Sequence, residues 1–452
     1  MRVLMVSDIH FDPFWDLEKV KELLPAPVEK WSAILGGPDS PDRADRFAAL
    51  QKMCQAKGMD TDYALLVSSV QALRANASDA RFVLASGDLL AHDFSCKYEA
   101  AVPHATADDY NAFAAKTLAF VMDRLRSTFP GVPVYAALGN NDSGCGDYRL
   151  DAGGAFLRTI APTLSADVPA AQRGQARGDL TAGGYYSVVL PAPMERTQLL
   201  VLDDVFMSRE YATCGGKPDA APAAQQIEWL RSQLERARRE DEKVWVMAHI
   251  PPGINPFSTI PNMKKVCAGA AAAMFLSSNA IADAIEEFGD VVRLAIFAHT
   301  HMDELRLLTA KQPGGTQRPV PLKMVPSVSP IHENEPTFVV ASVDPDSAIL
   351  KDYRVVAASN GTGVATAWHE EYDFDRAYGK KDFSEKSVER LIAEFGADDK
   401  AKTAASEEYL RYYYAGDRSA LLKLFWPQYT CVLANDTAEG FRSCACKSEA
   451  AQ

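Results

Sequence analysis

Five stretches of this sequence place side chains that can bind metal directly after a short apolar run. Each run has strand character and ends in a polar loop that opens with aspartate, asparagine or histidine. Ligands of open α/β sheets gather at the carboxyl ends of strands, so five strand ends of this form predict one shared site. The runs are residues 3–6 before Asp8 and His10, residues 82–85 before Asp88, residues 134–138 before Asn140, Asn141 and Asp142, residues 244–248 before His249, and residues 294–297 before His299 and His301.

The mixture of donors indicates which metals the site would take. Asp8 and His10 stand two residues apart, on one side of an extended chain, so both can reach the same ion. Asp88 can bridge two ions through its two oxygens, and Asn140 adds a neutral carbonyl oxygen. Carboxylate, amide and imidazole donors together favour Zn²⁺, Mn²⁺ or Fe over Ca²⁺ or Mg²⁺. Two such cations about 3.5–4 Å apart would clamp a phosphoester for attack by a metal-bridging hydroxide.

Each motif alone has a plainer explanation. Gly-Asp or Gly-Asn at a strand end is usually turn chemistry, and a lone histidine after a strand is usually structural. Five motifs in order, each at the end of an apolar run, are not explained in this way. Their conjunction therefore favours a metal site.

The stretches between the motifs predict the scaffold. Strands and helices alternate, which predicts βαβ crossovers and a largely parallel sheet. Helices are predicted after the cap Asp62 and over residues 108–129, 224–237 and 279–288, and further strands over residues 184–190, 197–202, 321–325 and 337–343.

The rest of the chain predicts two loops and a second structural unit. Residues 11–58 contain proline and glycine and are predicted to form a functional loop over the site, and residues 251–268 a second loop. The character changes after about residue 352, where helical patterns rich in charge and tyrosine begin. We therefore expect a catalytic domain in residues 1–352 and a small helical C-terminal subdomain in residues 353–452.

Composition narrows the class of partner. The 452 residues are 47% apolar and 24% charged, as in globular proteins, and carry a net charge of −13. An acidic surface argues against binding nucleic acid, so we expect no nucleic-acid partner, and a phosphate-bearing substrate would need bound cations to meet it. No window approaches the about 20 uninterrupted apolar residues of a membrane span, so no transmembrane segment is predicted.

The cysteines indicate the compartment. None of the eight lies in the five apolar runs, and most lie in polar, loop-like sequence, which favours disulfides in an oxidising compartment over free cytosolic thiols. The chain opens on a predicted core strand at Arg2 with no signal peptide. We expect a secreted or periplasmic protein whose leader is absent from this chain.

At these motifs the sequence resembles the calcineurin-like metallophosphoesterase superfamily, whose blocks are D-x-H, G-D, G-N-H-D/E, H and G-H-x-H. The resemblance spans roughly residues 1–343. Within the superfamily the chain is most similar to the acid sphingomyelinase-like phosphodiesterases. Asp88 followed four residues later by His92, the reading PSVSP over residues 326–330 and a helical C-terminal part ending in cysteines carry this closer likeness.

The resemblance implies an α/β fold with a β-sandwich flanked by helices, and two zinc ions. It implies a first metal held by Asp8, His10, Asp88 and His301, and a second held by Asp88, Asn140, His249 and His299. It also implies a disulfide between Cys214 and Cys267. For the C-terminal part we expect Cys431 to pair with Cys444 or Cys446.

Two positions depart from the family pattern. Asn141, which with His92 is a candidate catalytic residue, stands where the family has the histidine thought to protonate the leaving group. An amide can donate a hydrogen bond but cannot act as a general acid near neutral pH. His92 is then the main candidate acid. Ala298 replaces the glycine of G-H-x-H, a change that we expect the turn to tolerate.

These observations predict a binuclear-metal phosphodiesterase acting on a small-molecule or lipid-headgroup phosphoester, with a sphingomyelin or phosphocholine-like substrate first. A nucleotide or polyphosphate hydrolase on the same site is the alternative, and a non-catalytic metal-binding protein is a third. His332 lies in a loop that could line the cleft. Phe11, Phe14, Trp15 and Tyr148 follow ligand motifs and either form a substrate wall or pack their own loops.

Overall fold

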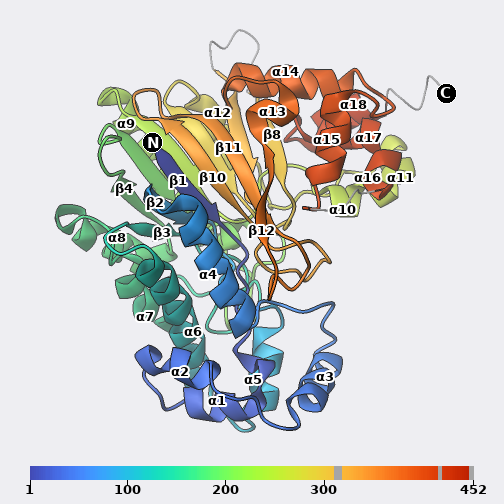
Figure 1. The fold of residues 1–452 in the computed structure, drawn as a ribbon. Helices are drawn as coiled ribbons and strands as arrows, with labels where there is room; N and C mark the ends of the chain where they lie inside the picture. Colours follow the sequence, from blue (N-terminus) through green and yellow to red (C-terminus); the bar gives the residue numbers. More distant parts are fainter. Residues whose placement is uncertain (310–317, 416–419, 447–452) are drawn as a thin grey trace.

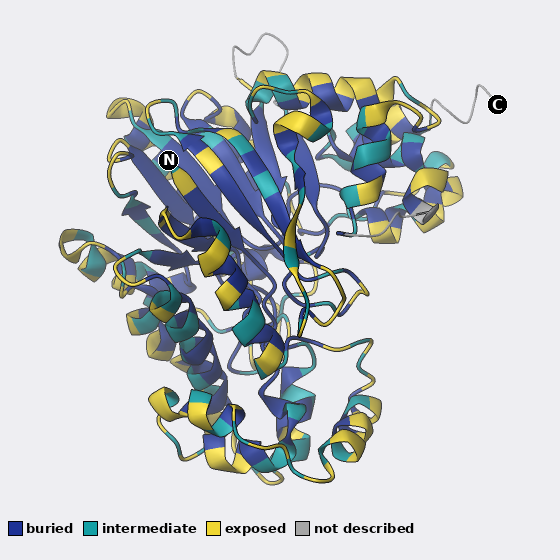
Figure 2. Ribbon diagram, in the orientation of Figure 1, coloured by how far each residue is buried: buried dark blue, intermediate teal, exposed yellow. Residues whose placement is uncertain are grey.

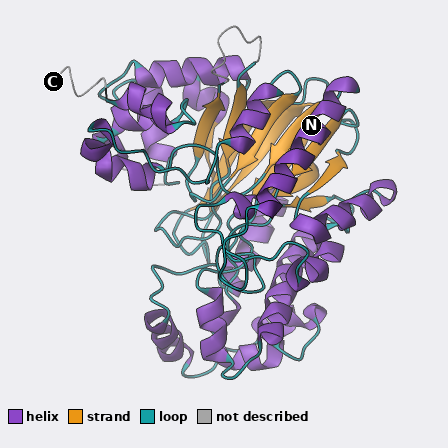
Figure 3. Ribbon diagram, turned by 180° about the vertical axis from the view of Figure 1, so that it is seen from behind, coloured by secondary structure: helices purple, strands orange, loops and turns teal. Residues whose placement is uncertain are grey.

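The computed structural model describes residues 1–309, 318–415 and 420–446, and its centre is a sandwich of two six-stranded sheets (Figures 1 and 3). The first sheet has the order β12-β11-β10-β1-β2-β3 and the second the order β4-β5-β6-β7-β9-β8. The strands of the first sheet are β1 (Arg2–Val6), β2 (Ala80–Ala85), β3 (Val134–Ala136), β10 (Thr337–Asp344), β11 (Ile349–Ala358) and β12 (Trp368–Asp373). Those of the second are β4 (Tyr186–Val189), β5 (Thr197–Val201), β6 (Lys243–Met247), β7 (Val292–Phe297), β8 (Glu304–Leu308) and β9 (Val320–Met324).

The sandwich implied by the resemblance is confirmed, whereas the largely parallel sheet predicted from the alternation of strands and helices is wrong, because both sheets are mixed. Strands β1, β2 and β3 run parallel, as do β5, β6, β7 and β9, but β10, β11 and β12 join the first sheet antiparallel. Strands β8, β11 and β12 had not been predicted. Strands β8 and β12 lie at sheet edges, and all three sequences contain charged residues that interrupt the apolar pattern by which the parallel strands were recognised.

The core lies between the two sheets, and most strand residues are coloured as buried in Figure 2, with β12 the main exception. Trp245 of β6 faces Phe82 of β2, with ring centroids 6.0 Å apart, so each sheet buries an aromatic side chain against the other. The indole nitrogen of Trp245 donates to the carbonyl oxygen of Ala348 at 2.8 Å, which satisfies its one polar group in the core.

Helices cover both outer faces. Leu230 and Leu234 of α9 and Ile281 and Ile285 of α12 pack on the second sheet, while α4 packs on the first. Asp62 caps α4 by accepting from the backbone nitrogen of Leu65 at 2.7 Å, as predicted. These helices are α4 (Tyr63–Ala77), α5 (Phe94–Ala101), α6 (Ala107–Thr128), α7 (Ala155–Leu164), α8 (Ala170–Gly183), α9 (Ala221–Arg239) and α12 (Ala280–Glu287).

The two predicted loops are wrong in part, because both contain short helices. Those after β1 form the lower lobe of Figure 1 together with α5. Phe11 and Phe14 are fully buried, Phe11 against Phe120 of α6 and Phe14 against Phe94 of α5, so these aromatics belong to the core and do not form a substrate wall. Proline and glycine interrupt the helices often enough to hide their periodicity. The short helices of the first loop are η1 (Pro13–Trp15), α1 (Leu17–Leu23), η2 (Val28–Lys30), α2 (Trp31–Leu35) and α3 (Arg43–Met53), and those of the second are α10 (Pro256–Thr259), η4 (Ile260–Asn262) and α11 (Met263–Cys267). A further short helix, η3 (Asp204–Met207), follows β5.

The domain boundary predicted between residues 352 and 353 falls inside β11, a strand of the first sheet. Strand β12 follows, and the C-terminal helices begin at Phe374. Two hydrogen bonds attach these helices and β12 to β8 and the residue before it: the Tyr429 hydroxyl donates to Glu304 and the Tyr372 hydroxyl to Asp303, each at 2.6 Å. The helices are α13 (Phe374–Tyr378), α14 (Glu385–Gly396), α15 (Ala404–Tyr412), α16 (Ala420–Leu424), α17 (Trp426–Val432) and α18 (Ala438–Ala445).

All eight cysteines form disulfides, but the pair Cys214–Cys267 is wrong. Cys214 pairs with Cys145, and Cys267 pairs with Cys446 across 179 residues of sequence. Spacing along the chain does not reveal that α11 lies against the C-terminal helices. Cys431 pairs with Cys444, one of the two alternatives, and the fourth bridge joins Cys54 to Cys96. Among the helices of the described residues, none has both the length and the apolar character to cross a membrane.

We predict that Trp245→Ala lowers the free energy of unfolding by about 3–5 kcal/mol, because it leaves a cavity between the sheets and an unpaired Ala348 carbonyl oxygen. Urea unfolding of the two proteins measures the difference. Leu424→Ala serves as the control, since Leu424 is 71% exposed and should change stability by less than about 0.5 kcal/mol. Equal losses in both variants would contradict the sandwich core.

Candidate metal centre

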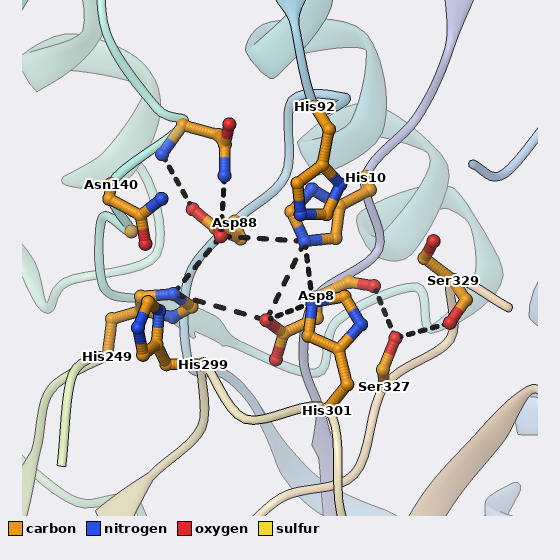
Figure 4. Close-up of polar contacts among 12 residues, drawn as sticks. Asp8, His10, Asp88, His92, Asn140, His249, His299, His301, Ser327 and Ser329 are labelled. Atoms are coloured by element: carbon orange, nitrogen blue, oxygen red, sulfur yellow. Dashed lines mark hydrogen bonds and ion pairs between the residues drawn. The ribbon is translucent and has the colours of Figure 1, made fainter. Parts of the chain in front are cut away.

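The structure brings all seven predicted metal ligands together at one edge of the sandwich. They follow the carboxyl ends of β1, β2 and β3 in the first sheet and of β6 and β7 in the second (Figure 4). All are buried except His299, which is half-buried. The parallel strands of both sheets therefore deliver their side chains to the same place.

The Asp88 carboxylate lies between two groups of donors. In Figure 4 Asn140, His249 and His299 lie on one side of it, and Asp8, His10 and His301 on the other. Asp88 Oδ2 is 3.2 Å from His249 Nε2 and 3.5 Å from His10 Nε2. On the second side, His301 Nε2 is 3.3 Å from Asp8 Oδ1 and 3.2 Å from His10 Nε2. These donor atoms lie close enough together, on both sides of the Asp88 carboxylate, to surround two cations.

Backbone carbonyls fix the histidine tautomers. His10 Nδ1 lies 2.8 Å from the Leu90 oxygen, and His249 Nδ1 lies 2.8 Å from the Ser86 oxygen. A carbonyl oxygen only accepts hydrogen bonds, so each Nδ1 carries the proton. Each Nε2 is then directed into the centre, which is the arrangement that metal-ligating histidines use.

The donor set fits divalent cations. Within the described part of the chain, Asp8 Oδ2 and Asn140 Oδ1 are buried without a hydrogen-bond partner. Burying such atoms unpaired costs about 1–3 kcal/mol each. A cation bound among them would supply the missing interactions.

The backbone is held in a sparsely populated conformation at the centre. Five of the seven residues have left-handed φ values between 44° and 72°: Asp8, His10, Asp88, His299 and His301. Such residues cost of order 1–3 kcal/mol each and persist where the surrounding structure fixes them, which is a feature of functional sites.

Asn141 binds Asp88 and does not face outward. Its backbone nitrogen donates to Asp88 Oδ1 at 2.8 Å and its side-chain amide donates to Asp88 Oδ2 at 2.9 Å. The next residue, Asp142, accepts from the backbone nitrogens of Leu89 and Leu90 at 2.8 and 3.0 Å. Both side chains therefore brace the Asp88 turn.

Electrostatics inside the centre are strong. Burial alone would raise the pKa of Asp8, but His301, His10 and His249 hold it well below its ordinary value. Burial disfavours a charged imidazole, yet Asp88 raises the pKa of His249 to about 10 and, with Asp8, that of His10 to about 9. Burial and the nearby His249 lower the pKa of His299 to about 4.

His92 lies beside the centre and partly exposed. Its ring stacks on that of His10, with centroids 3.9 Å apart. Asp60 accepts from the His92 backbone nitrogen at 2.9 Å and lies 3.0 Å from His92 Nδ1, so it fixes both the position and the tautomer of the ring. Buried Lys97 connects Asp60, at 3.5 Å, with Asp12, at 2.7 Å.

Two residues whose placement the sequence left open lie at the rim. The His332 ring is edge-on to the His301 ring, with centroids 4.7 Å apart. Tyr148 places its hydroxyl 3.4 Å from His299 Nε2. Ala298 keeps a negative φ, so the glycine of the family block is not needed there and the expected tolerance is confirmed.

Sequence reasoning missed Asp60 and Asp147. Asp60 orients His92, and Asp147 accepts from the side-chain nitrogen of Asn140 at 2.8 Å. Both lie in loops and follow no apolar run, so no local pattern distinguishes them from surface aspartates. Only their neighbours in space reveal them.

The fold and the converging donors define a metal-dependent phosphoesterase. The family model for calcineurin-like phosphoesterase matches residues 1–303. The chain belongs to this family, and it is a metal-dependent phosphodiesterase.

The alignments with curated relatives cover most of this chain. A cyclic GMP-AMP phosphodiesterase from Homo sapiens is 23% identical over 97% of this chain and 86% of that protein. Acid sphingomyelinase-like phosphodiesterase 3b from Homo sapiens is 23% identical over 87% of this chain and 79% of that protein. A dimetal phosphatase from Danio rerio, known as a crystal structure, is 14% identical with a TM-score of 0.41, covering 82% of this chain and 99% of that one.

We predict that metal uptake at pH 7 releases about two protons per chain and weakens as the pH falls. With pKa values raised to about 9 and about 10, His10 and His249 are protonated in the metal-free protein, and each must lose a proton before its Nε2 can bind a cation. Calorimetric titration of the metal-free protein in buffers of different ionisation enthalpy counts the protons. Uptake without proton release would contradict the involvement of these rings.

Proposed function

We propose that this chain hydrolyses a small phosphodiester at a two-metal centre bridged by Asp88. The position of the Asp88 carboxylate between two groups of buried donors carries this proposal. The first cation would be held by Asp8, His10, Asp88 and His301, and the second by Asp88, Asn140, His249 and His299. The mixed nitrogen and oxygen donors favour Zn²⁺, with Mn²⁺ or Fe as alternatives.

The bound cations would polarise the phosphoryl oxygens, neutralise their developing charge and activate the attacking water. The chain's own residues prepare this chemistry. Asn141 and Asp142 hold the bridging carboxylate in place. The cations also explain how a protein with a net charge of −13 can bind an anionic substrate.

His92 is the residue proposed to protonate the leaving group. It is a partly exposed imidazole beside the centre, and Asp60 holds its Nδ1 proton so that Nε2 is the atom free to exchange a proton with the substrate. Asn141 takes no part in proton transfer, because its side chain is an amide bound to Asp88.

Two substrate classes are proposed. A phosphocholine-type diester such as sphingomyelin agrees with the likeness to acid sphingomyelinase-like phosphodiesterases. A nucleotide diester is favoured by the relative named as a cyclic GMP-AMP phosphodiesterase, which aligns with 97% of the chain. The four disulfides support an extracellular or periplasmic location.

We predict zinc-dependent hydrolysis of bis-p-nitrophenyl phosphate that a chelator abolishes and added Zn²⁺ restores. Asp88→Ala should lose activity and bound metal together, because it removes a ligand of both cations. Phosphocholine release from detergent-dispersed sphingomyelin and cleavage of cyclic GMP-AMP, measured in parallel, distinguish the two substrate classes. An active, fully metal-loaded Asp88→Ala variant would contradict the bridging role.

We predict that His92→Ala slows the hydrolysis of alkyl phosphodiesters by about 100-fold or more, while p-nitrophenyl esters lose far less. A poor leaving group needs a proton in the transition state, whereas p-nitrophenolate leaves without one. The measurement is kcat for a matched pair of esters in both proteins. Equal slowing of both esters would remove His92 as the acid.

A further inference from the structure

One arm of the chain, residues 143–151, lies beside ligands of the proposed second metal position. The Cys145–Cys214 disulfide attaches this arm to a neighbouring segment. Two backbone hydrogen bonds do the same, from Ala212 nitrogen to Tyr148 oxygen at 3.0 Å and from Leu150 nitrogen to Ala212 oxygen at 3.2 Å. The position of the arm is therefore fixed by the protein itself.

Asp147 of this arm orients Asn140. The Asn140 side-chain nitrogen donates to Asp147 Oδ1 at 2.8 Å, and the Tyr148 backbone nitrogen donates to the Asn140 carbonyl oxygen at 3.0 Å. An amide side chain has a donor end and an acceptor end. Because Asp147 holds the donor end, Oδ1 is directed into the metal centre, where it is buried without a hydrogen-bond partner among the described residues.

Tyr148 orients His299 in the same way. Its hydroxyl lies 3.4 Å from His299 Nε2, and the two rings meet edge to face with centroids 6.3 Å apart. When Nε2 donates its proton to the tyrosine oxygen, Nδ1 is the ring nitrogen left to coordinate a cation. The hydroxyl thus selects both the tautomer and the direction of the ring.

We propose that Asp147 and Tyr148 are positioning residues that set the affinity of the second metal position without affecting the first. Asn140 and His299 belong only to the second set of ligands, whereas Asp8, His10 and His301 belong only to the first. The inference rests on the proposed function, because it assumes two bound cations. The inference goes beyond the proposed function because it assigns Asp147 and Tyr148 to the second metal position alone. The affinities of the two positions can then change independently.

Zinc release from wild-type protein, Asp147→Ala and Tyr148→Phe tests the proposal. Each protein is loaded with two equivalents of Zn²⁺ and titrated with a chromogenic chelator, and the metal left after each step is counted by mass spectrometry. We expect one zinc ion to be released at about 10–100-fold lower chelator concentration in both variants, and the other to stay as in the wild type. Asp147→Asn keeps an oxygen acceptor for the Asn140 amide and should restore most of the affinity.

Tyr211→Phe is the matched control. Its hydroxyl donates to the Leu150 carbonyl oxygen at 3.1 Å, so this variant also removes one tyrosine hydroxyl bond from the arm but leaves the proposed ligands untouched. Its zinc release should equal that of the wild type. Circular dichroism confirms that each variant is folded; Asp147 is exposed, so Asp147→Ala removes no core contact.

Three results would overturn the inference. If Asp147→Ala and Tyr148→Phe release zinc as the wild type does, the arm does not support the metal. If both zinc ions are bound more weakly to the same extent, the arm does not act on one position alone. A Tyr211→Phe variant as weak as Tyr148→Phe would assign the effect to the arm's packing. A wild-type chain that binds fewer than two zinc ions would contradict the proposed function itself, and this outcome is visible before any variant is compared.

Discussion

The carboxylate of Asp88 is the point on which the structure of the site depends. It is buried, it lies within 3.5 Å of histidines from both sheets, and it accepts two hydrogen bonds from Asn141. Two glycines allow this approach. A Cβ on Gly139 would lie 2.2 Å from Asp88 Oδ1, and Gly87, at φ +100°, would place a Cβ 2.8 Å from His249 Nδ1. The glycines of the two blocks are therefore required by close packing around one side chain.

The two sheets cooperate because their parallel strands end at the same edge. The first sheet supplies Asp8, Asp88 and Asn140, and the second supplies the histidines that face them. Behind this edge, β8 and the residue before it connect the centre with the C-terminal part through Asp303 and Glu304, which accept from Tyr372 and Tyr429. The C-terminal part thus stabilises the strand that directly follows His299 and His301.

The proposed metal ligands could be predicted from the sequence, whereas the residues that orient them could not. Asp8, His10 and Asp88 follow apolar parallel strands, so local pattern alone placed them at strand ends. Asp60 contacts His92 and Asp147 contacts Asn140, and both aspartates lie in loops. No sequence pattern near either aspartate predicts its contact.

The fold divides in the same way. The apolar runs revealed β1, β2, β6 and β7, whereas β12 carries charged side chains and escaped notice. The pair Cys214–Cys267, which the resemblance implied, is wrong because Cys267 lies beside Cys446 of the C-terminal part, 179 residues away in the sequence. What depends on neighbouring residues was predictable, and what depends on tertiary contacts was not.

Anomalous X-ray diffraction at the zinc edge, from crystals of zinc-loaded protein, tests the central claim most directly. The account predicts two peaks about 3.5–4 Å apart with the Asp88 carboxylate between them. A single peak, or two peaks that do not share Asp88, would contradict a bridged two-metal centre.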